Sequence, residues 1–194
     1  MMRKILITTL LCATPLLAEP KQVAFGMNIN TVDLEIEGKV PLGSKMRRVA
    51  FRNFFIDANF INGEDDTLTG IGMHVENTPR GHSNILLGFG FRGLFAKNDV
   101  LDKSFVAFPI SMMVQARMYL GNLPKSALSF KFAYAPEPLT FSDAKTYLEY
   151  RIEADMQIID NIDLYLGYRN IDTNYKGADV NFNSTAYLGG RFIF

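Results

Sequence analysis

The chain has 194 residues, about the length of one domain. Its 20 basic and 20 acidic residues cancel, which argues against nucleic-acid binding because that function requires a basic surplus on one face. The aromatic content is more informative, with 16 Phe, 8 Tyr and no Trp.

The first 18 residues have the pattern of an export signal. A basic opening over residues 1–4 is followed by an apolar stretch over 5–17, and Ala18 precedes a polar segment. We therefore expect a cleaved signal peptide over 1–18 and a mature domain over 19–194. A lipoprotein anchored at Cys12 is an alternative, but Leu11 stands where a small residue is needed. A membrane anchor is another, although the apolar run is shorter than the ~20 residues that a spanning helix needs.

The mature chain alternates apolar and polar residues with a period of two. In residues 144–159, even positions from Leu148 to Ile158 are apolar, whereas odd positions from Tyr147 to Gln157 are mostly charged. Since no mature segment offers 18 uninterrupted apolar residues, membrane helices are excluded. In chain order, strands are predicted at 22–29, 31–38, 49–62, 67–77, 84–96, 104–120, 125–136, 144–159, 161–173 and 183–194.

A soluble β-sandwich would also alternate in this way. Two features favour a membrane barrel: many predicted strands exceed the usual length of about five or six residues, and their polar faces are rich in glycine and in charges of both signs. In hydrocarbon, every backbone N–H and C=O must bond within the protein, so strands can span it only as a closed barrel. We predict an all-β fold, a closed antiparallel transmembrane β-barrel.

The expected number of strands is ten. The apolar phase switches between Ile29 and Val32, which predicts a turn or bulge over Asn28 to Thr31; eight strands remain the alternative if residues 22–38 form one bulged strand. Outer-membrane barrels have short periplasmic turns and longer outside loops. We accordingly expect short turns at 121–125 and 160–161 and long loops at 135–143 and 173–183. Pro109 must lie at a bulge, because a closed barrel has no edge strand.

Residues 131–171 carry a family resemblance. They contain a Tyr-x-Pro loop at Tyr134 to Pro136 and a Tyr-Arg pair at Tyr168 and Arg169, and the last strand ends on phenylalanine. In these features the chain resembles the YfaZ family of bacterial outer-membrane proteins. The resemblance implies a porin-like β-barrel in the outer membrane of a Gram-negative bacterium and implies no particular activity.

The alternation of apolar and polar residues places both acidic and basic side chains on the face of the strands that is expected to line the lumen. A selective pore would carry rings of one sign, whereas mixed charges in a narrow barrel favour salt bridges that fill the lumen. The acids expected inside include Asp33, Glu35, Glu37 and Asp57. The predicted lumen charge network comprises Arg92, Arg117, Lys131, Glu149, Arg151, Glu153, Asp155, Asp163, Arg169 and Arg191.

The preferred function is therefore a structural or binding role with a largely plugged lumen. A narrow channel for small solutes or ions is the alternative, and an outer-membrane hydrolase comes third. His74 is expected inside near the periplasmic end, and His82 beside Ser83 is a very weak catalytic signal. Residues 64–66 could attract Ca²⁺ but fit a solvated hairpin tip better. We predict no enzyme activity, catalytic residues, metal or cofactor.

The chain ends on GGRFIF, with Phe192 and Phe194 on the lipid-facing side of the closing strand. Aromatic residues gather at the interfaces of outer-membrane barrels. We expect Phe194 to anchor the strand at the periplasmic interface, and both residues to act as an assembly signal. The expected partners are outer-membrane lipid and the barrel-assembly machinery, with no nucleic acid; the oligomeric state is left open.

Overall fold

The computed structural model describes residues 23–42, 53–118, 124–175 and 178–194, with side chains omitted at 178–181. The predicted signal peptide over 1–18 lies outside the described residues, as do residues 22, 49–52 and 119–120 of three predicted strands. No helix in the described part of the chain is long and apolar enough to cross a membrane.

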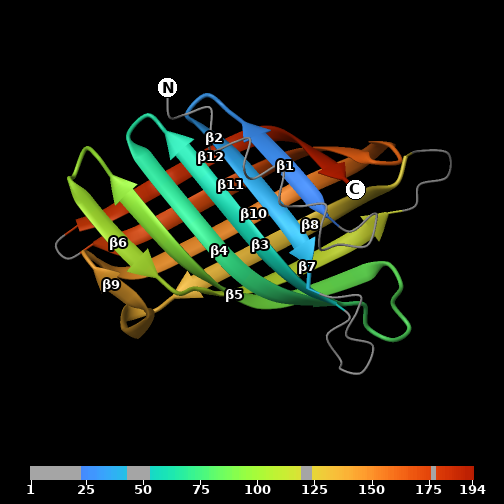
Figure 1. The fold of residues 1–194 in the computed structure, drawn as a ribbon, viewed down its shortest axis with the longest axis horizontal. Helices are drawn as coiled ribbons and strands as arrows, with labels where there is room; N and C mark the ends of the chain where they lie inside the picture. The colour runs from blue at the N-terminus through green and yellow to red at the C-terminus, as the bar shows by residue number, and fades with distance from the viewer. Residues whose placement is uncertain (1–22, 43–52, 119–123, 176–177) are drawn as a thin grey trace.

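The described chain is almost entirely antiparallel β-sheet (Figure 1). Neighbouring strands pair throughout, and β1 pairs with β12 in a register that sets Met27 opposite Gly190, so the sheet closes on itself. The strands are β1 (Ala24–Ile29), β2 (Asp33–Pro41), β3 (Phe54–Gly63), β4 (Asp66–Asn77), β5 (Ile85–Asn98), β6 (Lys103–Ala107), β7 (Ile110–Met118), β8 (Ser126–Ala135), β9 (Thr140–Ser142), β10 (Ala144–Ile159), β11 (Ile162–Tyr175) and β12 (Ala178–Ile193), and a 3-10 turn, η2 (Glu137–Leu139), stands between β8 and β9.

The twelve β segments form a barrel of ten strands, because two of the ten strands are each interrupted and counted as two segments. β6 and β7 both pair with β5, at Val106 opposite Phe95 and at Met112 opposite Phe89, so they are two halves of one strand. β8 pairs with β7 and β9 pairs with β6, which makes them halves of the next strand. β1 and β2 form a separate antiparallel hairpin around residues 30–32, so the prediction of ten strands is confirmed and the eight-strand alternative is wrong.

Pro109 lies at the first of these interruptions, as predicted. The backbone groups around it still find partners: the N–H of Phe108 donates to the carbonyl of Leu139 at 2.8 Å, and the N–H of Arg92 donates to the carbonyl of Pro109 at 3.1 Å. A proline lacks its own donor, so the break falls where the ladder can do without that bond.

The short turn predicted at 160–161 is confirmed, because β10 ends at Ile159 and β11 begins at Ile162, and most of the turn predicted at 121–125 lies outside the described residues. The two predicted long loops are wrong. Residues 173–183, expected as a long loop, belong mostly to β11 and β12, and residues 135–143 contain η2 and β9. The described connection of residues 78–84 instead lies at the end where β1 begins and β12 ends, which is also the end where β2 stops at Pro41 and β3 starts at Phe54. We call this the terminal end and the opposite one the hairpin end. Polar composition misled the prediction, because strands that continue into water are polar as well.

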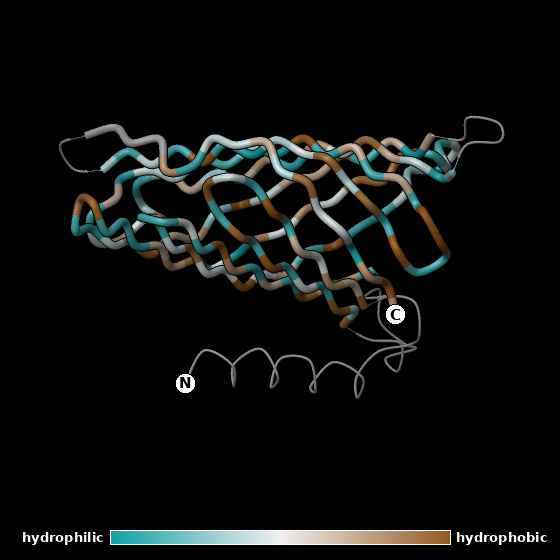
Figure 2. The backbone as a smooth tube through the Cα atoms, turned by 90° about the horizontal axis from the view of Figure 1, so that it is seen from above, coloured by the Kyte–Doolittle hydropathy of each residue, from teal (hydrophilic) through white to brown (hydrophobic). Residues whose placement is uncertain are grey.

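The outer face of the barrel is apolar. Inward and outward positions alternate in burial along β10, and the outward side chains Ile71, Leu166 and Leu188 are 63%, 62% and 61% exposed. Figure 2 shows the alternation as changes of hydropathy along the strands. So large an apolar exterior on a barrel with paired backbone groups is suited to lipid.

Near the hairpin end the inward residues of β4 and β5 are apolar: Leu68, Leu94 and Ala96. The outward face there is mixed, since Thr69 and Lys97 are exposed beside Phe95, which is 49% exposed. On β5 the outer face therefore becomes polar only beyond Phe95. Beyond the β1–β2 turn, β12 also loses one neighbour, since its pairing with β1 covers only Leu188 to Ile193 and the pairing with β11 continues alone to Ala178.

Leu164 lies in the outward row of β11, in the part of the barrel that β1 closes, so we expect Leu164→Arg to reduce stability in lipid vesicles by ~2–4 kcal/mol, the cost of a cation within the hydrocarbon layer. Urea titration followed by heat-modifiable gel mobility measures the change, with Leu164→Ile as the matched control. Equal midpoints for the two variants would contradict a lipid-facing position.

Candidate functional site

The inside of the barrel differs from one wall to the other. β10, β11 and β12 turn tyrosines and arginines inward, whereas β5, β7 and β8 place glycine, serine and alanine between longer inward side chains such as Arg92, Met113 and Lys131. The space left in front of the small residues forms a cavity of about 510 Å³. The small lining residues include Gly88, Ser111, Ser129 and Ala133.

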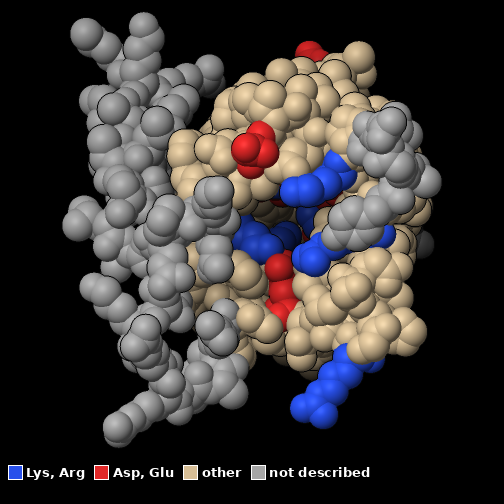
Figure 3. All heavy atoms as spheres, turned by 90° about the vertical axis from the view of Figure 1, so that its right-hand side faces the viewer, with Lys and Arg blue, Asp and Glu red and all other residues tan. Residues whose placement is uncertain are grey.

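This cavity lies at the terminal end. Its lining includes Ala24 at the start of β1 and Ile193 at the end of β12, and it reaches Glu35, Glu149 and Arg151 deeper in the barrel. Figure 3 looks onto this end and shows charged side chains, mostly Lys and Arg, around an opening. We call the cavity the cup and its three deep residues the floor.

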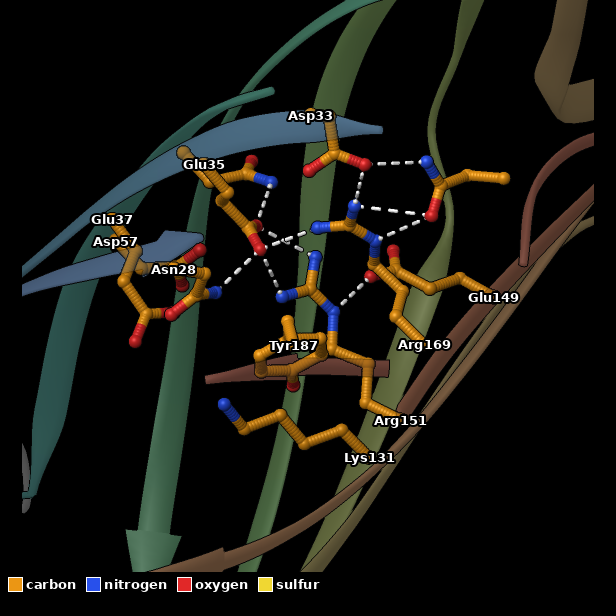
Figure 4. A network of polar contacts seen from close by, with 12 residues as sticks. Asn28, Asp33, Glu35, Glu37, Asp57, Lys131, Glu149, Arg151, Arg169 and Tyr187 are labelled. Atoms are coloured by element: carbon orange, nitrogen blue, oxygen red, sulfur yellow. Dashed lines mark hydrogen bonds and ion pairs between the residues drawn. The ribbon is translucent and has the colours of Figure 1, made fainter. Parts of the chain in front are cut away.

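The floor is organised around Glu35 on β2. This fully buried carboxylate accepts hydrogen bonds from both terminal nitrogens of Arg151, at 2.8 and 2.9 Å, and from Nη1 of Arg169 at 2.6 Å. Asn28 and Asn59 donate to its oxygens as well, at 2.6 and 3.2 Å (Figure 4). The paired charges offset the cost of burying each one alone.

Arg169 extends this network toward the hairpin end. Its Nη2 donates to Asp33 at 2.7 Å and to the side-chain oxygen of Asn183 at 3.0 Å, and Asn183 in turn donates to Asp33 at 2.7 Å. Arg169 and both of its carboxylate partners have fully buried side chains. The network thereby connects the first hairpin of the chain to its last two strands.

A second set of contacts runs from the floor to the mouth of the cup, with alternating charge. Arg151 donates to Glu149 at 2.5 Å, and Glu149 lies 3.9 Å from Arg92, which donates to Asp57 at 3.0 Å. From there His74 lies 2.7 Å from Asp57 and 3.0 Å from Glu76, and Glu76 pairs with Lys39 at 2.5 Å.

The opposite side of the cup holds a separate cluster around Glu153. This carboxylate lies 3.0 Å from Lys131 and 3.9 Å from Arg191, and it accepts a hydrogen bond from the hydroxyl of Tyr187 at 2.9 Å. Arg191 also donates to Glu37 at 3.2 Å. Each acid in the cluster therefore has a cation beside it.

Two glycines make room for the inward tyrosines of this wall. Tyr187 is paired across the strands with Gly167, and Tyr165 with Gly189. A Cβ atom on Gly167 would lie 2.5 Å from Cζ of Tyr187, closer than any real contact, so the ring requires a glycine there. The rings of Tyr165 and Tyr187 meet edge to face with centroids 6.3 Å apart and narrow the lumen.

Above the floor, at the hairpin end, the lumen is filled by apolar side chains. Phe105 is fully buried, and its ring lies within 5.8 to 6.4 Å of the rings of Tyr147, Tyr175 and Phe182. None of these four aromatic residues lines the cup. We call this group the apolar cluster: Ile61, Leu68, Leu94, Ala96, Phe105, Ala107, Ala135, Ala144, Tyr147, Ile171, Tyr175 and Phe182.

The predicted charge network is brought together only in part. Among the residues that the structure describes, Arg117, Asp155 and Asp163 form no ion pair, although Arg117 and Asp163 line the mouth. The seven members that form ion pairs are Arg92, Lys131, Glu149, Arg151, Glu153, Arg169 and Arg191.

The network also contains four residues that were not predicted: Lys39, Glu76, Asn28 and Asn183. Lys39 lies just beyond the strand predicted at 31–38, and asparagine on a polar face has no distinctive pattern. His74 lies inside near the terminal end, as expected, and Phe192 and Phe194 are exposed on the outer face at that end. Asp66, from the segment weighed as a calcium site, accepts a hydrogen bond from Asn98 at the hairpin end.

Replacing Arg169 with leucine should destabilise the barrel strongly, because Asp33 and Glu35 would keep buried charges with fewer partners. Breaking a well-buried pair costs ~3–5 kcal/mol. Arg117→Leu is the matched control, since Arg117 forms no ion pair with any described residue. Urea unfolding of refolded protein in vesicles measures both; equal midpoints would show that the network contributes little to stability.

Comparison with known proteins places the chain in a family. A family model described as "YfaZ precursor" matches residues 22–194. No curated protein matches the chain. Among solved structures, a KdgM porin is 9% identical with a TM-score of 0.43, over 89% of this chain and 99% of that one. A NanC porin is 13% identical with a TM-score of 0.44, over 90% of this chain and 99% of that one.

Those two likenesses are too low to bring any property of the porins to this chain. The closed barrel with an apolar exterior is, on its own physical grounds, the architecture of an outer-membrane β-barrel protein. Because the family model covers every described residue, the chain belongs to the YfaZ family.

Proposed function

We propose that this outer-membrane barrel does not conduct and that it presents a binding cup to the periplasm. The observation that carries the proposal is the apolar cluster, whose aromatic rings lie across the lumen at the hairpin end. Directly beneath it, Glu35 on β2 binds Arg151 on β10 and Arg169 on β11, so a buried network reaches across the lumen. A hydrated solute would have to displace both layers in order to pass.

The orientation follows from the even number of strands. A chain exported with its mature N-terminus in the periplasm, and crossing ten times, ends in the periplasm as well. The terminal end and the cup then face the periplasm, and the apolar cluster lies on the outside. In this orientation Phe192 and Phe194 lie at the periplasmic interface, where they would be accessible to the assembly machinery as the proposed signal.

A binding role fits the histidines better than catalysis does. Both ring nitrogens of His74 lie within hydrogen-bond distance of carboxylates, those of Asp57 and Glu76, which favours a structural link in the charged wall. His82 belongs to a backbone turn, in which its N–H donates to the carbonyl of Pro79 at 3.1 Å. A hydrolase would require a nucleophile held beside a free base.

Refolded protein in a planar lipid bilayer should therefore give no steady single-channel openings. Phe105→Ala, which removes the central ring of the apolar cluster, should introduce or increase leak currents. Phe95→Ala is the control. Phe95 on β5 pairs with Val106, the residue next to Phe105, and its side chain faces outward. Steady openings of the unmodified protein would overturn the plugged lumen and favour the narrow channel.

A further inference from the structure

The charges of the cup are not equally accessible. In three ion pairs along its wall the cation is the more exposed partner: side-chain exposure is 34% for Lys131 against 3% for Glu153, and 32% for Lys39 against 11% for Glu76. Arg92 is 25% exposed against 6% for Glu149. The pair of Arg191 and Glu37, at 18% and 21%, and the pair of His74 and Asp57, at 18% each, are even. Glu76, Glu149 and Glu153 are therefore recessed in the wall, and the cations paired with them are the more exposed partners.

The carboxylate oxygens of the recessed acids already have hydrogen-bond and ion-pair partners within the protein. Glu153 has Lys131, Tyr187 and Ser129 as partners, and Glu149 accepts from both Tyr147 and Arg151. Their oxygens have little capacity left for an incoming cation. Among the acids that line the cup, Glu37, Asp57 and Asp163 stay partly exposed.

The cations retain donors. A lysine ammonium carries three N–H groups, and Lys131 has one ion-pair partner among the described residues. Arg117 is exposed, lines the cup and has no ion-pair partner in the described part of the chain. Such donors favour carboxylate and phosphate groups, whose oxygens form strong charge-assisted hydrogen bonds.

The rest of the lining is partly apolar. Phe55, Leu86, Pro109, Met113 and Phe132 all contribute to it. A cavity of about 510 Å³ lies within the usual range for small-molecule sites, which combine apolar walls with a few polar groups. The occupant therefore has room for a carbon body in addition to its charged group.

We infer that the cup binds a small organic anion from the periplasm, with Lys131 and Arg92 deeper in the site and Lys39 and Arg117 at its mouth. The inference rests on the proposed function, because it requires a cup that is closed toward the outside. A lining with balanced charge can still select an anion, because a ligand contacts the more exposed partner of each ion pair, and in these pairs that partner is the cation. Charge-assisted contacts with the exposed donors supply the selectivity.

Glucose 6-phosphate, glucose and glucosamine share one carbon ring and differ in charge, so they make a suitable probe series. Isothermal titration calorimetry of the full mature barrel in detergent micelles should detect glucose 6-phosphate, with glucose and glucosamine at least about ten-fold weaker. Equal or stronger binding of glucosamine would overturn the anion preference.

Arg117→Gln and Lys131→Met should each weaken glucose 6-phosphate binding by about ten-fold, the usual effect of losing one charge-assisted hydrogen bond. Arg80→Gln is the matched control, since it removes an exposed cation in the 78–84 turn at the same end of the barrel, outside the cup lining. Unfolding midpoints of Arg117→Gln should match those of the unmodified protein, which separates ligand loss from misfolding.

Two results tell the failures apart. If the bilayer stays silent but no probe binds, or if both variants bind as well as Arg80→Gln, the anion site is wrong while the plugged barrel stands. If glucose 6-phosphate passes through proteoliposomes that contain the unmodified protein, the closed cup itself is wrong, and the inference fails with it.

Discussion

A carboxylate in the middle of the barrel, that of Glu35, controls how the interior can be arranged. With no water to solvate it, its charge must be balanced at contact distance and its oxygens must all accept hydrogen bonds. Arg151 and Arg169 approach it from β10 and β11, and Asn28 approaches from β1. These partners bring the ends of the sheet together, so the same contacts that neutralise the acid also hold the first hairpin against the last strands.

The cup is a consequence of the same arrangement. Arginines and tyrosines long enough to reach Glu35 and Glu153 crowd one wall, and glycines behind the rings of Tyr165 and Tyr187 let that wall pack closely. The facing wall carries Gly88, Ser111, Ser129 and Ala133 between its longer side chains, and these small residues leave the space that forms the cup. A binding cavity thus arises from unequal side-chain size around a regular barrel, without a specialised loop.

Much of the fold could be predicted from the sequence, because alternation is a local property. The ten strands, the irregularity at Pro109 and the lipid-facing positions of β5, β8, β10 and β11 all follow from residues close together in the chain. Loop length could not be predicted in this way, since residues 173–183 are polar as loops are, yet residues 173–175 belong to β11 and residues 178–183 to β12.

Which charged residues pair with each other could not be predicted from the sequence either, for a different reason. Arg151 and Glu35 are 116 residues apart, and which inward residues meet depends on barrel register and stagger. The inward set could be named, but Arg151 could not be assigned to Glu35. Nor could Arg117 be recognised as the inward arginine without an acid beside it among the described residues.

Beyond Leu188, toward Ala178, β12 pairs with β11 but with no strand on its other side among the described residues. This free edge limits how deeply the barrel can be inserted in the membrane. Hydrocarbon does not tolerate a strand edge with free N–H and C=O groups, so the acyl chains on this side must end near the β1–β2 turn. At that height the outer face carries Tyr168, whose hydroxyl bonds to Ser184 at 2.7 Å, a polar contact suited to the headgroup layer. The parts of β11 and β12 beyond this height then extend out of the membrane, and the backbone pairing alone indicates where the hydrocarbon layer ends.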